Sequence, residues 1–407
     1  MAGPLSHIRV LDLSRVLAAP WTGQILADLG AEVIKVERPK TGDDSRAFGP
    51  PWIKDANGRD TTESAYFTCA NRGKKSITLN ISKPEGQKIV RDLAAKCDVL
   101  LENYKYGDLA RYGLAYDDLR KINPRLIYCS VTGFGHTGPF RERPGYDFMI
   151  QGMGGLMSIT GERDDQPGGG PQRAGIPISD LITGMYAAVA VNAALAHRAE
   201  TGVGQHLDLA LLDSTVAVLA NQGANYLSTG KPPARIGNAH PNIVPYQAFK
   251  TADGDMIVAC GNDGQFRKLC EVAGRPELAD DPRFATNGKR VENRETLVPM
   301  MAGIVAKRAT RDWIDALDAA GVPVGPINNL EQVFQEPQAV ARGLRIELDH
   351  PLAGKVSLVR SPMRFSETPV EHKAPPPTLG QHTDEILRRT LKLGDAQIAK
   401  LRADGIV

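Results

Sequence analysis

The chain has 407 residues, of which 42% are hydrophobic and 24% charged, and its formal net charge is +2 at pH 7. A chain of this length can bury a large core, which predicts two domains or one large α/β unit with an insertion. The small net charge argues against nucleic acid and against an anionic membrane surface as partners. Five dispersed cysteines without a C-x-x-C pair, and eight histidines without an H-x-x-x-H pair, predict neither a disulfide framework nor a metal site.

The N-terminal sequence has neither the apolar core of a secretory signal nor the Arg- and Ser-rich amphipathic form of a transit peptide. No apolar run approaches the length of about 18 residues that a membrane-spanning helix needs. We therefore expect a soluble, cytoplasmic protein.

Hydrophobic periodicity in the first part of the chain predicts a strand at 8–14, a short helix at 19–30 and a second strand at 31–37. Further strands are expected at 75–81, 98–104 and 125–134, with helices at 83–97 and 114–122. Alternating strands and helices favour a parallel sheet. The first turn lacks G-x-G-x-x-G, which argues against a dinucleotide oxidoreductase, and Walker A, G-x-S-x-G and H-E-x-x-H motifs are also missing.

A domain boundary is expected at 231–245, where four prolines follow a strand and a long apolar helix predicted over 204–230. The next segment has its own strand signals and short helices, and from about 321 the chain is expected to return to the first domain. The predicted fold is α/β: a Rossmann-like parallel-sheet large domain made of 1–225 and 326–407, with a smaller second domain at 226–325.

Asp180 is the one carboxylate in the apolar stretch "GIPISDLITGMYAAVA". Strand-like residues at 176 and 178 precede it, and a helix is predicted from 181 to about 200, ended by Gly202 and Gly204. An aspartate in this position is a good N-cap. A carboxylate between a strand end and a helix start also lies where open α/β sheets bind ligands. Both interpretations stay open from these residues alone, and they are compatible: we expect Asp180 to cap its helix, a placement that would also present its carboxylate at the ligand end of the sheet.

Basic, aromatic and amide side chains follow several predicted strands. Each alone is more typical of a solvated surface, but together at carboxyl ends of strands they predict a pocket for a phosphorylated ligand. These residues are Arg38, Arg72, Lys74, Lys75, Asn103, Tyr104 and Arg111.

An ordered series of short stretches runs along nearly the whole chain: "LDLSRVLAAP", "LGAEVIKVERP", "NRGKKSITLN", "TGFGHTGPF", "GYD", "DLITGMYA" and "TGVGQHLDLALLDS". In this order they resemble the family III CoA-transferases of the CaiB/BaiF type. The later "VPYQAFKT", "GVPVGPINN", "EPQ" and "LGQHTDEIL" are most similar to the succinyl-CoA:glutarate (dicarboxylate) branch of that family.

The resemblance implies a chemical role for Asp180, which falls on the family's catalytic aspartate in a D-x-x-x-G-M stretch. Its carboxylate would attack an acyl-CoA thioester to form an aspartyl anhydride, and CoA thiolate would convert this anhydride into an aspartyl-CoA thioester. An acceptor such as glutarate would then take the CoA. Both intermediates hydrolyse, so the site must exclude water and offer fixed donors to the oxyanions.

The family also implies that CoA thioester is a substrate and that no cofactor or metal is bound permanently. The CoA contacts that it implies are Val16, Arg38, Lys74 or Lys75, Asn103, Tyr104 and Arg111. Arginine suits phosphate groups because its planar guanidinium donates several hydrogen bonds at once.

The chain departs from related enzymes at two stretches. "GNAHPNIVP" replaces a run of glycines found in formyl-CoA transferases, so His240 and Asn242 are expected in a stiffer lid for a longer acid. Tyr146 in "GYD" replaces the histidine of α-methylacyl-CoA racemases and is expected, with His240 and Asn242, to bind substrate or belong to the lid. A phenol with a pKa of about 10 is a poor base at neutral pH, which demotes the alternative of an acyl-CoA racemase or isomerase. His136 is expected to make a loop hydrogen bond.

A second carboxylate on the acid would need a cation, for which Arg46, Arg163 and Arg173 are candidates. The family further implies a homodimer of two interlocked, ring-like chains. The expected ligands are therefore an acyl-CoA and a small carboxylic acid, and the expected protein partner is a second copy of the chain.

Overall fold

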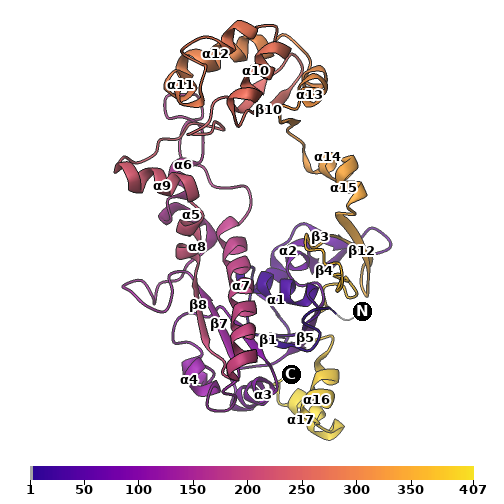
Figure 1. The fold of residues 1–407 in the computed structure, drawn as a ribbon. Coiled ribbons are helices and arrows are strands. Elements are labelled where there is room, and N and C mark those ends of the chain that lie inside the picture. Colours follow the sequence, from indigo (N-terminus) through magenta and orange to yellow (C-terminus); the bar gives the residue numbers. More distant parts are fainter. Residues whose placement is uncertain (1–2) are drawn as a thin grey trace. The chain divides into compact units, whose positions relative to one another are not determined.

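A computed structural model describes residues 3–407 and divides into two compact units (Figure 1). The large unit comprises Met1–Gly155, Gly175–Val218 and Pro337–Val407, and the small unit comprises Leu156–Ala174 and Leu219–Glu336. This division differs from the expected one in three places: 156–174 and 219–225 were expected in the large domain but belong to the small unit, and the chain returns to the large unit at Pro337 and not at 326. Within the small unit, Arg235 pairs with Asp164 and donates to the carbonyl oxygen of Ser158 at 3.1 Å, so the segment 156–174 is held there.

The large unit contains a six-stranded parallel sheet, which confirms the predicted α/β fold class. The strand order is β5 (Lys74–Thr78), β2 (Glu32–Glu37), β1 (Arg9–Asp12), β6 (Val99–Glu102), β7 (Ile127–Thr132) and β8 (His206–Ala210). Leu11 of β1 lies opposite Ile34 on one side and Leu100 on the other. The chain runs outward from β1 to β5 and then returns to add β6, so the winding direction reverses between β1 and β6. Ligands of open α/β sheets bind at such a reversal.

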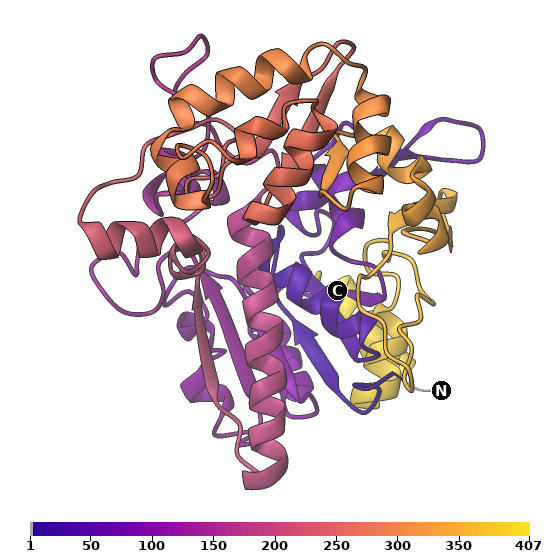
Figure 2. The ribbon, with the colours of Figure 1, turned by 45° about the horizontal axis from the view of Figure 1, so that its top comes forward.

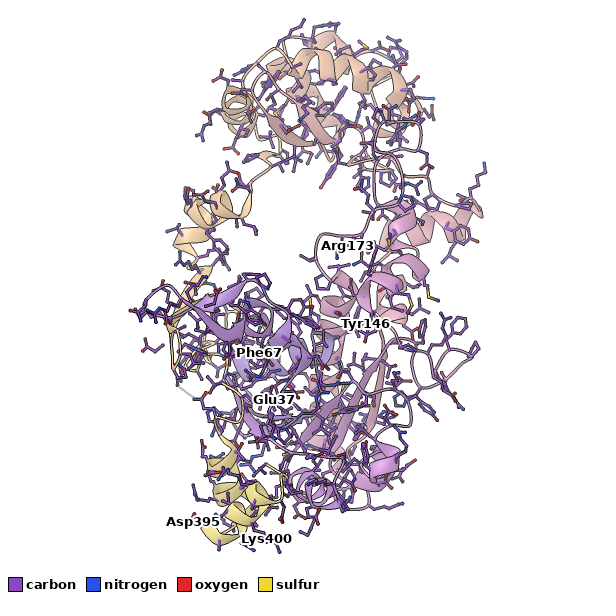
Figure 3. The ribbon with its side chains drawn as sticks, turned by 180° about the vertical axis from the view of Figure 1, so that it is seen from behind. Glu37, Phe67, Tyr146, Arg173, Asp395 and Lys400 are labelled. Carbon is purple, nitrogen blue, oxygen red and sulfur yellow. The ribbon has the colours of Figure 1, made fainter. Side chains whose placement is uncertain are left out.

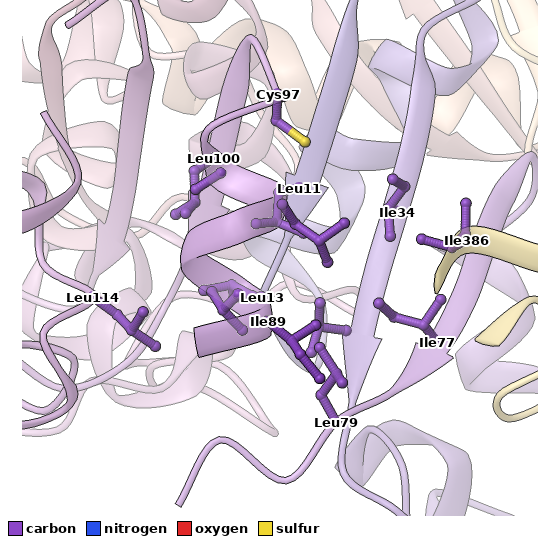
Figure 4. Packing of buried hydrophobic residues seen from close by; sticks show 14 of the residues in the cluster. Leu11, Leu13, Ile34, Ile77, Leu79, Ile89, Cys97, Leu100, Leu114 and Ile386 are labelled. Atoms are coloured by element: carbon purple, nitrogen blue, oxygen red, sulfur yellow. The ribbon is translucent and has the colours of Figure 1, made fainter. Parts of the chain in front are cut away.

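Helices cover both faces of this sheet. On one face α3 (Pro84–Ala94), α16 (Thr383–Leu391) and α17 (Asp395–Ala403) contribute to an apolar core with Leu11 and Ile77 (Figure 4). On the other face α1 (Ala18–Asp28) and α7 (Ile178–Thr201) pack on Val10 and Val99. The returning C-terminal chain joins the edge of the sheet, where the amide of His382 donates to the carbonyl oxygen of Ser76 at 2.8 Å.

The remaining elements of the large unit are shorter. They are η1 (Asp44–Ala47), β3 (Trp52–Lys54), β4 (Asp60–Ser64), α2 (Ala65–Cys69), η2 (Ala110–Tyr112), α4 (Tyr116–Leu119), α5 (Asp147–Met153), α8 (Leu211–Ala217), α15 (Pro337–Ala341), β12 (Arg345–His350) and β13 (Gly354–Val359). No strand forms at 176 and 178, contrary to expectation, because Ile178 already begins α7. The single helix expected after β8 is interrupted, since Ala220 has a left-handed φ of 46°.

Helix α7 lies along the sheet beside α1 (Figure 2). A glycine is required at their crossing, because a Cβ on Gly184 would lie 2.5 Å from the carbonyl oxygen of Ala18. Among residues 3–407, α7 is the one helix that is long and apolar enough to cross a membrane by length and composition, which the sequence analysis did not anticipate. Its buried side belongs to the core of the large unit through Ala187, Val191 and Ala194.

The small unit has a three-stranded antiparallel sheet in the order β11 (Val324–Pro326), β10 (Asp255–Ala259) and β9 (Tyr246–Lys250). Its core includes Phe249, Met256 and Trp313. Its helices are α6 (Leu156–Ile159), α9 (Ala220–Thr229), α10 (Asp263–Val272), η3 (Pro276–Ala279), α11 (Asn287–Glu292), α12 (Arg294–Val305), α13 (Thr310–Ala319) and α14 (Leu330–Gln335).

Candidate active site

A cavity of about 240 Å³ opens in the large unit where the sheet reverses its winding. Its walls come from the loop after β1, the loop after β6, the end of β7 and the segment before α5, and Asp180 at the start of α7 contributes a carboxylate. Segments far apart in the sequence therefore meet at the carboxyl end of the sheet. The position is the one that sheet topology predicts for a ligand.

Asp180 does not cap its helix, so the expectation that it would be the N-cap is wrong. Helix α7 begins at Ile178 with Pro177 at the N-cap, and no side chain of its own sequence caps it. Asp147 takes this role from α5, because its Oδ1 accepts from the amides of Ser179 at 2.8 Å and Asp180 at 3.3 Å. The carboxylate of Asp180 is thereby left for the cavity.

The surroundings of Asp180 disfavour its charge. Burial is the main cause, and the nearby carboxylate of Asp147 adds to it; together they raise the pKa of Asp180 from its ordinary 3.8 to about 7. No cation lies within ion-pair distance of Asp180 in the part of the chain that the structure describes. A poorly solvated carboxylate with a pKa near neutrality is a candidate for covalent chemistry.

Helix α1 begins beside this carboxylate. Its N-cap, Leu17, has no side chain able to accept a hydrogen bond, and its first turn carries no acidic residue. Pro20 has no N–H and the amide of Trp21 donates to the carbonyl oxygen of Leu17 at 2.7 Å, so the amides of Ala18 and Ala19 are the ones left for water or a ligand. Leu17, Ala18 and Asp180 all line the cavity, so backbone donors and the carboxylate face a common space.

The loop that leads into α1 has a strained conformation. Val16 has a φ of 68°, in the left-handed region that β-branched residues rarely adopt. The amide of Val16 donates to Oδ1 of Asp43 at 3.0 Å. The side chain of Asn103 holds the preceding residue, Arg15, by two hydrogen bonds: it accepts from the Arg15 amide at 2.8 Å and donates to the Arg15 carbonyl oxygen at 2.7 Å. Asn103 thus fixes the loop after β1 to the loop after β6.

The opposite wall depends on close backbone contact between two glycines. A Cβ on Gly133 would lie 2.5 Å from the Cα of Gly145, so neither position admits a larger residue without a shift. Gly145 precedes Tyr146, which is labelled in Figure 3 and is 72% exposed while it lines the cavity. The "GYD" stretch therefore combines a packing glycine, an exposed phenol and the capping Asp147.

Comparisons with known proteins agree with this arrangement. The family model "CoA-transferase family III" matches residues 5–383. The chain belongs to this family. It is 50% identical over 384 residues to the succinate--glutarate CoA-transferase of Agrobacterium fabrum, covering 94% of this chain and 95% of that protein.

A mammalian relative and a solved structure extend the match. The succinyl-CoA:glutarate CoA-transferase of Mus musculus is 46% identical over 404 residues, covering 99% of this chain and 90% of that protein. The crystal structure of a CAIB/BAIF family protein from Brucella suis has a TM-score of 0.83 and 50% identity, covering 96% of this chain and all of that one. This chain is therefore a CoA-transferase, as its sequence motifs indicated.

Two lysines that were expected to contact CoA lie elsewhere in this CoA-transferase. They begin β5 rather than follow a strand. Lys74 is fully buried: its Nζ lies 2.8 Å from Oδ2 of Asp12 and donates to the carbonyl oxygen of Pro20 at 2.8 Å. It offers no atom to a ligand in this conformation. Lys75 forms ion pairs with Glu385 at 2.6 Å and Glu32 at 3.2 Å.

Three other predicted CoA contacts surround the cavity. Tyr104 lines it, and the guanidinium of Arg15 lies 5.2 Å from the centre of its ring. Arg38 pairs with Asp44 and Arg111 pairs with Asp108; both aspartates line the cavity, whereas the two arginines do not. Arg38 and Arg111 are about half and two-thirds exposed, so both remain accessible at its rim.

The predicted acid-binding cations are not in the cavity wall. Arg46 is buried in ion pairs with Glu37 and Glu63, and its guanidinium lies 3.7 Å from the ring centre of Phe67. Glu37 and Phe67 are labelled in Figure 3. Arg163 and Arg173 belong to the small unit, where Arg163 pairs with Asp165 and Glu295.

His240 and Asn242 also belong to the small unit, and their side chains are held there. Nδ1 of His240 accepts from the amide of Asn242 at 3.0 Å, and Oδ1 of Asn242 accepts from the side chains of Asn221 and Asn225. The backbone amide of His136 donates to Asp208 at 2.9 Å, whereas its side chain, for which a loop hydrogen bond was expected, lies against the rings of Tyr106 and His206. It lies outside the cavity wall.

The cations that do line the cavity were not predicted from the sequence; they are Arg15, Lys105, Arg141 and Arg143. Arg143 packs over the rings of Phe140 and Phe134, with 4.5 and 5.4 Å between the guanidinium and each ring centre. No carboxylate lies within ion-pair distance of Arg143 or Lys105 among residues 3–407. The signal was "FRERP" between two family motifs, where two arginines precede "GYD".

No group of three or more His, Cys, Asp or Glu side chains in residues 3–407 is arranged to hold a metal ion. The cavity instead offers one reactive carboxylate, uncapped helix donors and cations. This set suits an anionic acyl thioester and a carboxylic acid.

Proposed function

We propose that this CoA-transferase moves CoA from succinyl-CoA to glutarate or a similar dicarboxylate, with Asp180 as the nucleophile. The supporting observation is that Asp147 caps α7, which leaves the poorly solvated Asp180 carboxylate facing a cavity at the reversal of the sheet. The named activities of the relatives at 46–50% identity support the choice of acids.

The reaction needs four acyl transfers and no external oxidant or base. An Asp180 oxygen bonds to the succinyl carbonyl carbon, and the C–S bond breaks to release CoA thiolate. The thiolate then attacks the Asp180 carbonyl carbon of the anhydride, which releases succinate and leaves an aspartyl-CoA thioester. Glutarate attacks this thioester and again releases the thiolate. Finally, the thiolate attacks the glutaryl carbonyl, which yields glutaryl-CoA and restores the carboxylate.

Each tetrahedral intermediate carries a negative charge on oxygen. The amides of Ala18 and Ala19 in the first turn of α1 have no cap, and Ala18 lines the cavity, so these donors are suited to stabilise this charge. Val16, Asn103, Tyr104, Arg38 and Arg111 remain our proposed CoA contacts. Lys74 is removed from this set because it is buried in an ion pair, which leaves the partly exposed Lys75 as the lysine proposed to contact CoA.

Substitution of Asp180 tests the nucleophile. Asp180→Ala and Asp180→Asn are expected to lower transfer from succinyl-CoA to glutarate by roughly a thousandfold or more, since the covalent route is lost. Asp213→Asn is a matched control, because Asp213 also lies in the first turn of a helix of the large unit but is exposed. Hydroxylamine trapping after incubation with succinyl-CoA should label Asp180 alone. Normal turnover in either Asp180 variant refutes the assignment.

For the distal carboxylate of the acid we propose Arg143, the arginine in the cavity wall that is packed on two aromatic rings and has no carboxylate partner among residues 3–407. Arg143→Gln should raise KM for glutarate by roughly 10- to 100-fold while leaving KM for pentanoate, which lacks the second carboxylate, little changed. An equal effect on both acids would mean that Arg143 does not recognise the distal group.

We also propose a homodimer, which the exposed side of α7 supports. Met185, Tyr186 and Val189 are 54%, 44% and 67% exposed on this helix, and such an apolar stripe is typical of a protein interface. Light scattering during size-exclusion chromatography should give twice the mass of the 43.9 kDa chain. Val189→Asp should shift that mass toward the monomer, and an unchanged dimer would exclude this face.

A further inference from the structure

Two buried ion pairs, which both contact Ser14, lie next to residues 13–17, which we call the first loop. Four charged side chains form them, with exposed fractions of 0–1%: Asp12, Lys35, Asp43 and Lys74. We propose that Asp43 and Lys35 are positioning residues for the CoA-transfer reaction: they hold Val16 in its strained conformation and so fix the start of α1 against the cavity. The inference rests on the proposed function, because it assumes that this cavity is where CoA is transferred.

Asp43 is the link between the charges and the strained residue. Its Oδ1 accepts from the amide of Val16 at 3.0 Å and from the amide and hydroxyl of Ser45 at 2.9 and 2.8 Å. Its Oδ2 lies 2.8 Å from Nζ of Lys35. One carboxylate thus holds the first loop with one oxygen and a buried cation with the other.

The same cation reaches the first loop a second time. Nζ of Lys35 donates to the carbonyl oxygen of Ser14 at 2.8 Å. Asp12 holds Ser14 from the other side, because its Oδ1 accepts from the Ser14 amide at 2.9 Å and from the Ser14 hydroxyl. The first loop is therefore held at Ser14 and at Val16 by partners from β1, β2 and the segment before η1.

The ion pair of Asp12 and Lys74 contacts helix α1. Oδ2 of Asp12 lies 2.8 Å from Nζ of Lys74, which donates to the carbonyl oxygen of Pro20 at 2.8 Å. Gly23 of α1 permits this contact, since a Cβ there would lie 2.9 Å from Asp12 and 3.0 Å from Lys74. The loop and the first turns of α1 are thus fixed to one buried framework.

Energetics favour a positioning role over a merely stabilising one. Burying two ion pairs costs desolvation free energy, and the attraction between the paired charges only partly offsets it. Apolar residues of similar size at these positions would often give a fold that is at least as stable. Val16, with its left-handed φ, adds backbone strain to this cost. Such costs are typical of sites where the geometry of a reactive group matters. Here the strained residue lines the cavity beside Asp180.

The chain offers a matched control in Asp28. Asp28 forms a separate buried ion pair, in which its Oδ2 lies 2.6 Å from Nη2 of Arg72. Arg72 in turn donates to the carbonyl oxygen of Val359 at 2.7 Å. This pair has similar burial but no contact with the first loop. Asp43→Asn and Asp28→Asn should therefore both lower stability, whereas only Asp43→Asn should disturb the cavity.

Two measurements separate these effects. Asp43→Asn should lower kcat/KM for succinyl-CoA by roughly 10- to 100-fold through misplacement of the loop, with Asp28→Asn within about twofold of wild type. In protein without substrate, amide hydrogen exchange over 13–18 should become at least about fivefold faster in Asp43→Asn and stay unchanged in Asp28→Asn. Equal behaviour of the two variants in either measurement overturns the inference.

A milder variant covers the case in which Asp43→Asn does not fold. Ser45→Ala removes only the hydroxyl that donates to Oδ1 of Asp43 at 2.8 Å, the oxygen that also holds the Val16 amide, and it should raise exchange over 13–18 and lower kcat/KM in the same direction. Wild-type rates in this variant would then contradict the inference. The exchange measurement needs no turnover, so a wild-type protein that fails to transfer CoA refutes the proposed function while the positioning of the loop is still tested.

Discussion

Two sets of buried carboxylates in the large unit differ in whether a cation faces them. Beneath the first loop, Asp12 and Asp43 each lie 2.8 Å from a lysine Nζ. At the start of α7, Asp180 faces the carboxylate of Asp147 instead. Burial would raise the pKa of all three, but Lys74 and Lys35 keep those of Asp12 and Asp43 below the ordinary value, whereas that of Asp180 rises to about 7.

The contrast separates structural carboxylates from a reactive one. A carboxylate that is held by a cation and several donors is stable as an anion and has no tendency to form a new bond. Asp180 lacks these partners, so its oxygens are free to attack a carbonyl carbon. Residues of the same type thus acquire different roles because their neighbours push the pKa values apart.

The largest expected effect comes from removing the cation beneath the first loop. Lys35→Met leaves Asp43 buried without its partner, which should cost about 3–5 kcal/mol of unfolding free energy. Urea unfolding at pH 7 measures this loss. Lys88→Met is the control, because the Lys88–Asp92 pair is exposed and should contribute at most about 0.5 kcal/mol. A loss of similar size in both variants would remove the distinction between buried and exposed pairs.

Removing the unpaired carboxylate of Asp180 should raise the free energy of unfolding at alkaline pH, by less than the loss expected for Lys35→Met. The pKa of Asp180 is raised by folding, so its contribution to stability is fully present below about pH 4 and is lost as the pH rises through about 7. Asp180→Asn does not titrate and escapes this loss. Its melting temperature should therefore exceed that of wild type by a few degrees at pH 8, with little difference at pH 4.

The exposed Asp213 again serves as a control for this measurement. Asp213→Asn should show no difference from wild type that grows with pH. If Asp180→Asn were less stable than wild type at pH 8, the carboxylate would have a stabilising partner and the comparison with Asp43 would fail.

Much of the fold could be predicted from the sequence because it depends on local patterns. The strands around Leu11, Ile34 and Leu100 are short apolar runs, and the intervening helices have the matching period. Asp180 was found as a candidate nucleophile through a family motif. The motif alone did not decide between a cap and a nucleophile, since that answer depends on Asp147, 33 residues earlier.

The missed features depend on tertiary partners. Lys74 and Lys75 are neighbours in sequence, yet one is fully buried against Asp12 and the other is partly exposed. Nothing in "RGKKS" distinguishes them, because the partner of Lys74 is 62 residues away. Arg143 likewise cannot be distinguished from a surface arginine in the sequence, because its place in the cavity wall depends on the contact between the segment before α5 and the carboxyl end of β7. The sequence therefore gives the identity of a charged residue but not its burial or its ion-pair partner.

Asp147→Asn should change stability least of these variants. It tests most directly how much the neighbouring charge, as distinct from burial, sets the pKa of Asp180. An amide oxygen can still accept from the amides of Ser179 and Asp180, so the loss of charge at the start of α7 should cost only about 1 kcal/mol. Without that charge the pKa of Asp180 should fall, but not to 3.8, because burial is the larger cause of its rise. The acid limb of the pH profile of kcat/KM should therefore move to lower pH by roughly half a unit to one unit. An unmoved limb together with lower stability would mean that Asp147 acts only as a cap and that burial alone sets the reactivity of Asp180.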